Sequence, residues 1–209
     1  MTPAVFTFYQ KLPTWNHGTI VGVWKRNWKS HGWRPIVMGR EMAKRHPMFG
    51  DFLTKIRTFP TINDPAYEEA CYIRWLAFEI MLDATDGRAT MSDYDVFNNG
   101  FTAEDQGTED VVCHEITQVP CLVSANKKGA REIVEFIMSR NPDHAIGHYS
   151  DMIAFKESDW PVSGFCQEIG EVRGSCPWEE SKTIHAASGA IHREAPGWDK
   201  TRYIQKHYH

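Results

Sequence analysis

Hydrophobic and polar positions in the first part of the chain predict a strand, a helix and a second strand. Residues 4–9 and 35–38 are short β-rich runs. Between them, apolar residues recur at helical spacing over residues 20–28, and Gly32 follows as a helix-ending residue. Because a helix joining two strands is the repeating unit of parallel sheets, this order predicts an α/β protein with a parallel, nucleotide-binding sheet.

The pattern continues with further alternating elements. A longer helix begins at Asp64, a capping residue, with Pro65 at its first helical position. Its second half is apolar almost all round, which is typical of a buried helix. The other expected elements are short helices at 40–46, 49–57 and 148–156, strands at 111–116 and 121–124, a helix over 130–138, a loop over 158–181, a last strand or turn at 183–191, and a tail or helix at 201–209.

Arg74 lies inside the apolar helix. A buried guanidinium needs an anionic partner. A carboxylate in a structural ion pair and the phosphate of a ligand both satisfy that need, and both interpretations stay open.

Two carboxylates, Asp93 and Asp95, end the short buried strand predicted over residues 88–97. Alternate residues of a strand share a face, so both carboxylates can reach one object if the strand continues through them. Close like charges repel, and Mg²⁺ or Mn²⁺ is the natural partner of such a pair. The alternative is a solvated Asp-x-Asp turn without a metal.

The block from Tyr72 through Gly87 to Phe97 resembles the central block of GT-A-fold glycosyltransferases. In that family an Arg-bearing helix precedes a strand that ends in a metal-binding Asp-x-Asp. The block is most similar to capsular-polysaccharide sugar transferases, and more loosely similar to the small glycosyltransferase domains that large algal viruses use on their capsid protein. It departs from the family at Asp86-Gly87, where two adjacent glycines are usual.

The resemblance implies one domain over residues 1–209, with a mixed, mostly parallel GT-A-like sheet flanked by helices. Residues 1–100 would be the nucleotide-binding half, and residues 101–209 the acceptor half with a late metal-ligand loop. No G-x-G-x-x-G follows the first strand. This agrees with a GT-A fold and argues against an NAD-type site.

The same resemblance implies a metal-dependent glycosyltransferase, hexosyl or deoxyhexosyl. It would move a sugar from a UDP-sugar to a hydroxyl of a glycan or glycoprotein, with retention of configuration. Mn²⁺ or Mg²⁺ would stabilise the departing diphosphate. The resemblance assigns Asp93 and Asp95 to the metal and the nucleotide-sugar, with His185 as a third metal ligand and His192 as its competitor. Trp198 stands later than the Trp that follows this His in the family.

Other candidate residues lie at the expected strand ends. Thr7 and Tyr9 end the first strand, where open α/β sheets bind ligands, and the resemblance assigns them to the nucleotide. Arg74 would approach the nucleotide or hold the Asp-x-Asp loop. Asp151 falls where related enzymes place an acid beside the donor sugar, and it is the catalytic candidate; a helix cap or first-turn acid is the alternative.

Candidate general bases have no distinguishing signal. Glu168 and Glu171 lie in the segment expected to be a loop and could serve as a base, but they read equally well as solvated acids. Retaining transferases of this fold often lack an obvious protein base, because the leaving phosphate can take the proton.

Composition narrows the class of protein. The 209 residues are 42% hydrophobic and 24% charged, as in globular domains. A net charge of -4 without a basic run gives no indication of nucleic-acid binding. No stretch is long enough for a transmembrane helix, so we expect a cytoplasmic protein, in the host-cell cytoplasm if its source is viral. Five cysteines without a C-x-x-C motif predict reduced thiols.

Two other functional classes remain open. A nucleotidyltransferase or phosphohydrolase would need more carboxylates at the metal or a glycine-rich phosphate loop, and the sequence shows neither. A non-catalytic carbohydrate-binding module would keep its ligand after Asp95→Ala. A metal-bridged donor site would instead lose UDP.

Overall fold

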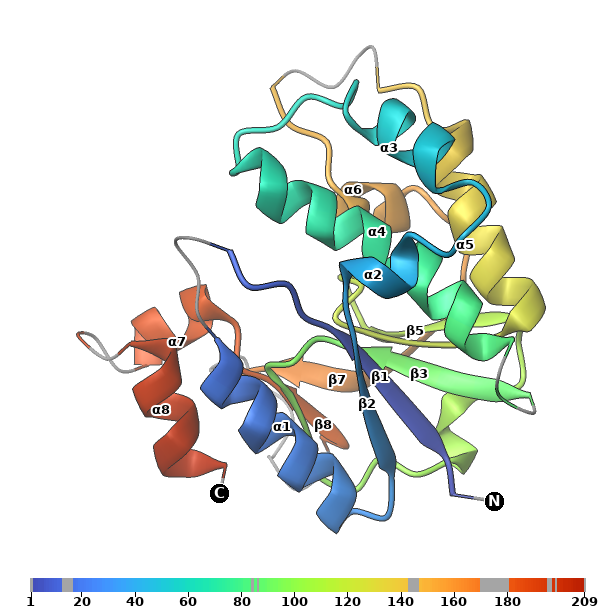
Figure 1. Ribbon diagram of the computed structural model, residues 1–209. Coiled ribbons are helices and arrows are strands. Elements are labelled where there is room, and N and C mark those ends of the chain that lie inside the picture. The colour runs from blue at the N-terminus through green and yellow to red at the C-terminus, as the bar shows by residue number, and fades with distance from the viewer. Residues whose placement is uncertain are drawn as a thin grey trace.

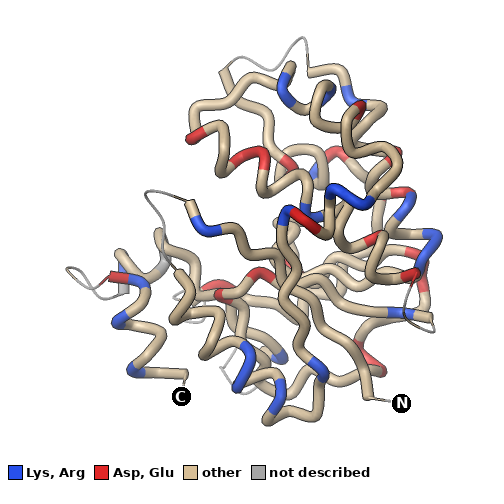
Figure 2. Tube along the Cα trace, in the orientation of Figure 1, with Lys and Arg blue, Asp and Glu red and all other residues tan. Residues whose placement is uncertain are grey.

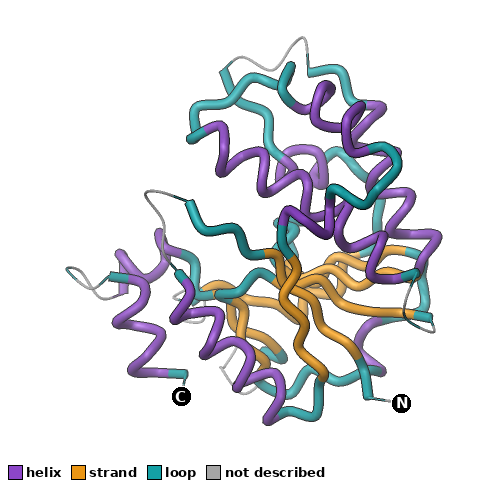
Figure 3. The backbone as a smooth tube through the Cα atoms, viewed as in Figure 1, coloured by secondary structure: helices purple, strands orange, loops and turns teal. Residues whose placement is uncertain are grey.

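The computed structural model describes residues 2–12, 17–83, 85, 87–142, 147–169, 181–194, 197 and 199–208. One curled sheet runs through the centre of this described part, with helices packed against both of its faces (Figure 3). The expectations that fall on Asp86, Glu171, Cys176, Trp198 and His209 lie outside the described residues.

The first three strands are parallel neighbours. Strand β1 (Ala4–Phe8) pairs with β2 (Arg34–Met38) on one side and with β3 (Arg88–Ser92) on the other. All of β1 is buried, which explains its nearly continuous apolar sequence. Helix α1 (Gly18–Ser30) connects β1 to β2, and Gly32 follows it at φ 83°, a left-handed conformation that suits glycine. The predicted strand, helix and strand are confirmed.

Two hydrophobic cores lie on opposite faces of the sheet. Successive residues of β1 divide between them, with Phe6 in one core and Val5 in the other. Helix α1 and two C-terminal helices cover the Val5 face (Figure 1). The Phe6 face is covered by α2 (Arg40–Ala43), α3 (Phe49–Ile56), α4 (Pro65–Leu82), α5 (Lys127–Ser139) and α6 (Asp151–Lys156).

The second half of the sheet mixes both strand directions. Strands β5 (Val111–Glu115) and β6 (Leu122–Asn126) confirm the two strands expected at 111–116 and 121–124. They are antiparallel to each other, and β6 pairs with β3. Strand β7 (Val162–Glu168) runs parallel to β5 and to β8 (Thr183–His185), and β8 pairs antiparallel with β4 (Val96–Asn98). The order β2-β1-β3-β6-β5-β7-β8-β4 confirms a mixed, mostly parallel sheet in one α/β domain.

Two strand expectations need correction. The loop expected over 158–181 is wrong at Val162–Glu168, where backbone pairing with β5 and β8 makes a strand of a weakly patterned sequence. The strand before the carboxylates does not continue through them. It ends at Ser92, because the N–H of Val96 bonds to the carbonyl of Asp93 and closes a turn.

The C-terminal segments are more helical than expected. Residues 183–191 divide into β8 and the start of α7 (Ser188–Glu194), and α8 (Lys200–His207) takes the helical alternative for the last segment. No helix of the described residues has the length and apolar character to cross a membrane. Lys and Arg positions are interspersed with Asp and Glu along the trace (Figure 2).

Candidate active site

A cavity of about 380 Å³ lies beyond the carboxyl ends of β1 and β3. Tyr9 follows β1 and Asp93 follows β3, and both line it. Its other walls come from α4, from the start of α6 and from the segment after β8. This is the place where open α/β sheets bind their ligands.

Asp93, Asp95 and His185 meet at one end of the cavity. Their ligand atoms lie within 4.8 Å of one another. The turn that carries the carboxylates is fixed by two backbone bonds, from Asp93 N to Cys121 O at 2.7 Å and from Ala186 N to Asp95 O at 2.8 Å. Pairing of β4 with β8 places His185 opposite Val96 and therefore beside Asp95. Two carboxylates and an imidazole form a donor set that suits Mn²⁺ and Mg²⁺.

The charges at this end are strongly coupled. Burial favours the neutral form of Asp95, yet the positive charges of Lys200 and His185 outweigh it and hold the pKa of Asp95 well below its usual range. Burial also opposes the charged form of His185, but Asp95 prevails and raises the pKa of His185 to about 9. Burial raises the pKa of Asp93 to about 6 despite the nearby Arg74. A bound cation would displace protons from this group.

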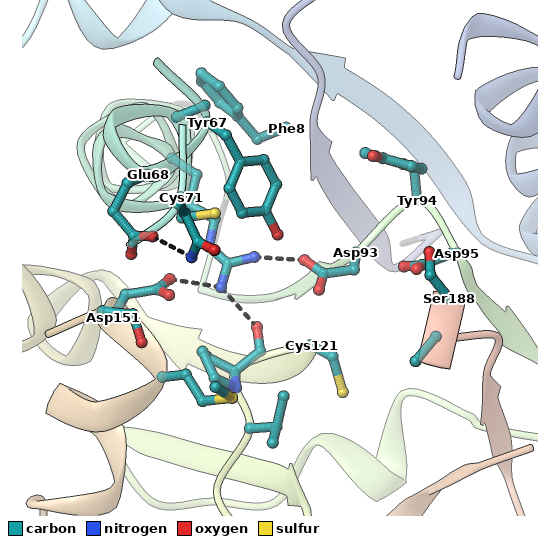
Figure 4. Close-up of a pocket in the computed structure, with 18 of the residues that line it drawn as sticks. Phe8, Tyr67, Glu68, Cys71, Asp93, Tyr94, Asp95, Cys121, Asp151 and Ser188 are labelled. Atoms are coloured by element: carbon teal, nitrogen blue, oxygen red, sulfur yellow. Dashed lines mark hydrogen bonds and ion pairs between the residues drawn. The ribbon is translucent and has the colours of Figure 1, made fainter. Parts of the chain in front are cut away.

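Arg74 joins the two acidic parts of the cavity. Its Nη1 contacts Asp93, while Nη2 donates to Asp151 Oδ2 at 2.6 Å and to the carbonyl of Pro120 at 3.1 Å (Figure 4). The side chain is 9% exposed. The anionic partner required by its burial is therefore a pair of carboxylates, and the guanidinium also lines the cavity.

Asp151 points toward Arg74. Ser150 caps α6, its Oγ accepting from Ile153 N, and Asp151 is the first residue of the helix. The Asp151 carboxylate accepts from Arg74 and from the indole N–H of Trp75 at 3.2 Å. The cap of α6 is therefore Ser150, and Asp151 is a first-turn acid, as the alternative interpretation allowed. It is also a buried acid on the cavity wall.

The remaining candidate residues differ in whether they line the cavity. Tyr9 lines the cavity and packs edge-on against Tyr94, whereas Thr7 is completely buried inside β1 and does not line it. His192 is exposed on α7 and is not part of the candidate metal site formed by Asp93, Asp95 and His185. Glu168 pairs with Arg193 at 3.0 Å outside the cavity wall.

Several cavity residues gave no functional signal in the sequence. Lys200 contacts Asp95 from the first position of α8, and Tyr94 stands between the two aspartates. His17 Nδ1 lies 2.8 Å from the hydroxyl of Tyr94. Glu68 also lines the cavity, but its place in the first turn of α4 explains it without a functional role, because the helix dipole favours an acid there. Only Tyr94, inside the Asp-x-Asp motif, could have been proposed from spacing.

No protein-family model and no curated protein sequence matches this chain. Solved structures do match. Glycosyltransferase GlyE of Streptococcus pneumoniae aligns over 99% of this chain and 60% of its own, at 10% identity and TM-score 0.56. A glycosyltransferase involved in glycosylation of the major capsid of PBCV-1 aligns over 98% and 100%, at 7% identity and TM-score 0.58.

Galactosyltransferase LgtC, solved with donor and acceptor sugar analogues, aligns over 97% of this chain and 94% of its own, at 13% identity and TM-score 0.56. This chain spans only 60% of the length of the GlyE chain. The shared fold is that of GT-A-type glycosyltransferases, so the resemblance seen around Asp93 and Asp95 is confirmed at the level of the fold.

Proposed function

We propose that this protein is a metal-dependent glycosyltransferase that transfers a sugar from a UDP-sugar to a hydroxyl of a glycan or glycoprotein, with retention of configuration. The observation that carries the proposal is the meeting of Asp93, Asp95 and His185 at the strand ends of a glycosyltransferase fold.

Three side chains would hold the cation. The carboxylates of Asp93 and Asp95 and the imidazole of His185 would bind Mn²⁺ or Mg²⁺. Such an ion, when bound, neutralises negative charge on a departing diphosphate. Lys200 adds a protein cation on the same carboxylate, Asp95, and lines the cavity. Its ammonium, which contacts Asp95, would donate to diphosphate oxygens.

Arg74 and Asp151 would orient the transferred sugar. The guanidinium fixes the carboxylates of Asp93 and Asp151, and Asp151 keeps acceptor capacity for sugar hydroxyls. The ring of Tyr9, beside Tyr94, offers an aromatic surface for the base. The leaving phosphate would take the proton of the acceptor hydroxyl, so transfer needs no separate protein base.

The test is release of UDP from UDP-glucose and UDP-galactose with Mn²⁺. His185→Gln should lower the rate on the order of 100-fold, because it removes a metal ligand. The matched control His192→Gln, at the exposed His of α7, should keep the wild-type rate. Equal rates in the two variants, or release of pyrophosphate from nucleoside triphosphates instead, would overturn the proposal.

A further inference from the structure

A second group of polar side chains lines the cavity away from the metal ligands. Glu68 on α4 is only 6% exposed, and its carboxylate accepts a hydrogen bond from Asn63 Nδ2 at 2.8 Å. The other carboxylate oxygen, Oε1, is buried without a hydrogen-bond partner among the described residues. The same holds for His148 Nδ1, and both side chains line the cavity. Glu68 lies beside Asp151 and away from Asp95 (Figure 4).

Glu68 is costly to the fold as it stands. A buried polar oxygen loses hydration, and no described side chain forms a hydrogen bond with Oε1 to restore it. Burial raises the pKa of Glu68, and the negative charge of Asp151 adds to that effect. Hydrogen bonds from Asn63 and Thr61 and the charge of His148 oppose it. No Lys or Arg of the described chain forms an ion pair with Glu68, since Arg74 is committed to Asp93 and Asp151. A buried acid of this kind on a cavity wall is more readily explained by a ligand than by stability.

The surroundings select the kind of ligand. Two neighbouring carboxylates, Glu68 and Asp151, repel an anion. A hydroxyl group can donate to Oε1 without bringing a charge into the cavity. The imidazole of His148 lines the same cavity and lies close enough to Glu68 to affect it electrostatically. It can donate or accept a hydrogen bond, as recognition of a polyhydroxylated ligand requires.

We propose that Glu68, supported by His148, binds a hydroxyl of the sugar that is transferred. The inference rests on the proposed function, and it makes Glu68 a residue that determines which sugar nucleotide is bound. Contacts run in a row from Asp93 through Arg74 to Asp151, and Glu68 comes next to Asp151. A sugar whose diphosphate lies near Asp95 therefore extends toward Glu68. Selection by this residue depends on the hydroxyl that it accepts.

The experiment is calorimetric titration, with Mn²⁺, of UDP, UDP-glucose, UDP-galactose and UDP-xylose into wild type, Glu68→Ala and Glu68→Gln. Glu68→Ala should keep the wild-type affinity for UDP and lose on the order of 10-fold for the preferred sugar nucleotide. Glu68→Gln should lose less affinity than Glu68→Ala, because its amide keeps one oxygen that can accept from the sugar. Some loss is still expected, since that oxygen can accept from Asn63 instead. The matched control Glu69→Gln, on the same helix but paired with Arg40 and Arg57, should bind every ligand as wild type does.

Thermal unfolding of the same variants provides a readout that a structural role predicts differently. Glu68→Gln should match or exceed the melting temperature of wild type at neutral pH, because it removes a buried charge that has no Lys or Arg partner among the described residues. A clear fall in melting temperature would assign Glu68 to the fold and overturn the inference.

The binding outcomes also separate the two proposals. Equal losses for UDP and the sugar nucleotides, or no loss for any of them, would remove the Glu68 subsite while leaving the glycosyltransferase proposal intact. Normal sugar-nucleotide binding with altered transfer would move Glu68 to the acceptor and overturn its assignment to the transferred sugar. Failure of wild type to bind UDP at all would remove both proposals.

Discussion

Arg74 is the residue on which the geometry of the candidate site depends. It lies inside a buried helix and is held by two carboxylates and a backbone carbonyl. Desolvating a guanidinium is costly, so breaking such a cluster leaves uncompensated buried charge. Its position keeps Asp93 and Asp151 on one wall of the cavity.

Arg74→Lys should lower the free energy of unfolding by about 3 kcal/mol, because one ammonium cannot contact both carboxylates and the Pro120 carbonyl. Urea denaturation measures the change. The control is Arg57→Lys, whose side chain is 62% exposed in its pair with Glu69 and should change stability by less than about 0.5 kcal/mol. Similar losses in both variants would contradict a special role for Arg74.

At this scale the sequence was informative where a local motif carries the chemistry. Asp93 and Asp95 stand out by their spacing, and the burial of Arg74 follows from the helix around it. Lys200 and Glu68 could not be identified in this way. Their roles arise from the docking of α8 against the strand ends and from the closure of the cavity over the start of α4.

The strands are joined by a buried chain of polar contacts. Gln106 donates to Thr90 at 2.9 Å, and the hydroxyls of Thr90 and Ser124 lie 2.8 Å apart. His114 on β5 then links Ser124 on β6 to Ser163 on β7, at 2.8 Å on each side. A fully bonded chain of this kind connects neighbouring strands at a low dielectric.

His114 should make the fold acid-sensitive. Burial lowers the pKa of His114 to about 3. Below about pH 6.5 the unfolded chain therefore binds a proton at this imidazole that the native state does not bind until the pH approaches 3. The contribution of the neutral His114 to the free energy of unfolding is therefore fully present above pH 6.5 and is lost as the pH falls toward 3. Between pH 7 and pH 4 wild type should lose about 3 kcal/mol more than His114→Gln. Parallel losses in urea titrations at these pH values would rule out this role.

Helix α5 depends on a glycine at a close approach. A Cβ on Gly129 would lie 1.9 Å from the carbonyl oxygen of Asp110, which is backbone and cannot rotate away. Gly129→Ala should therefore cost about 2 kcal/mol or more of stability. Gly22→Ala in α1 is the matched control. Its Cβ meets only Arg26 Nη1 at 3.7 Å, so it should stabilise by up to about 1 kcal/mol. Equal effects on the melting temperatures would show that the close approach is absent.

Helices were predictable from spacing and caps, as α1, α4 and α5 illustrate. Strands β4 and β7 were not, because each is defined by its partners. Strand β4 has three residues and exists through its pairing with β8, and β7 has a glycine at φ 73° within it. Local sequence contains little of that information.

The whole molecule assembles the site from both ends of the chain. Strand β1 supplies the floor near Tyr9, while β8 and α8 bring His185 and Lys200 to the same cavity. Helix α8 packs against α1 (Figure 1), and Tyr208 stacks on Phe97 with ring centroids 4.4 Å apart. The proposed binding of metal and donor should therefore require both the N-terminal and the C-terminal elements in their folded positions.

The most direct test of the central claim is calorimetric titration of UDP with Mn²⁺ and then with EDTA. UDP should bind with Mn²⁺, and that binding should be lost with EDTA and in Asp95→Asn. The control Asp159→Asn, at an exposed position, should bind as wild type does. UDP binding that survives both EDTA and Asp95→Asn, or no binding under either condition, would contradict a metal-bridged donor site.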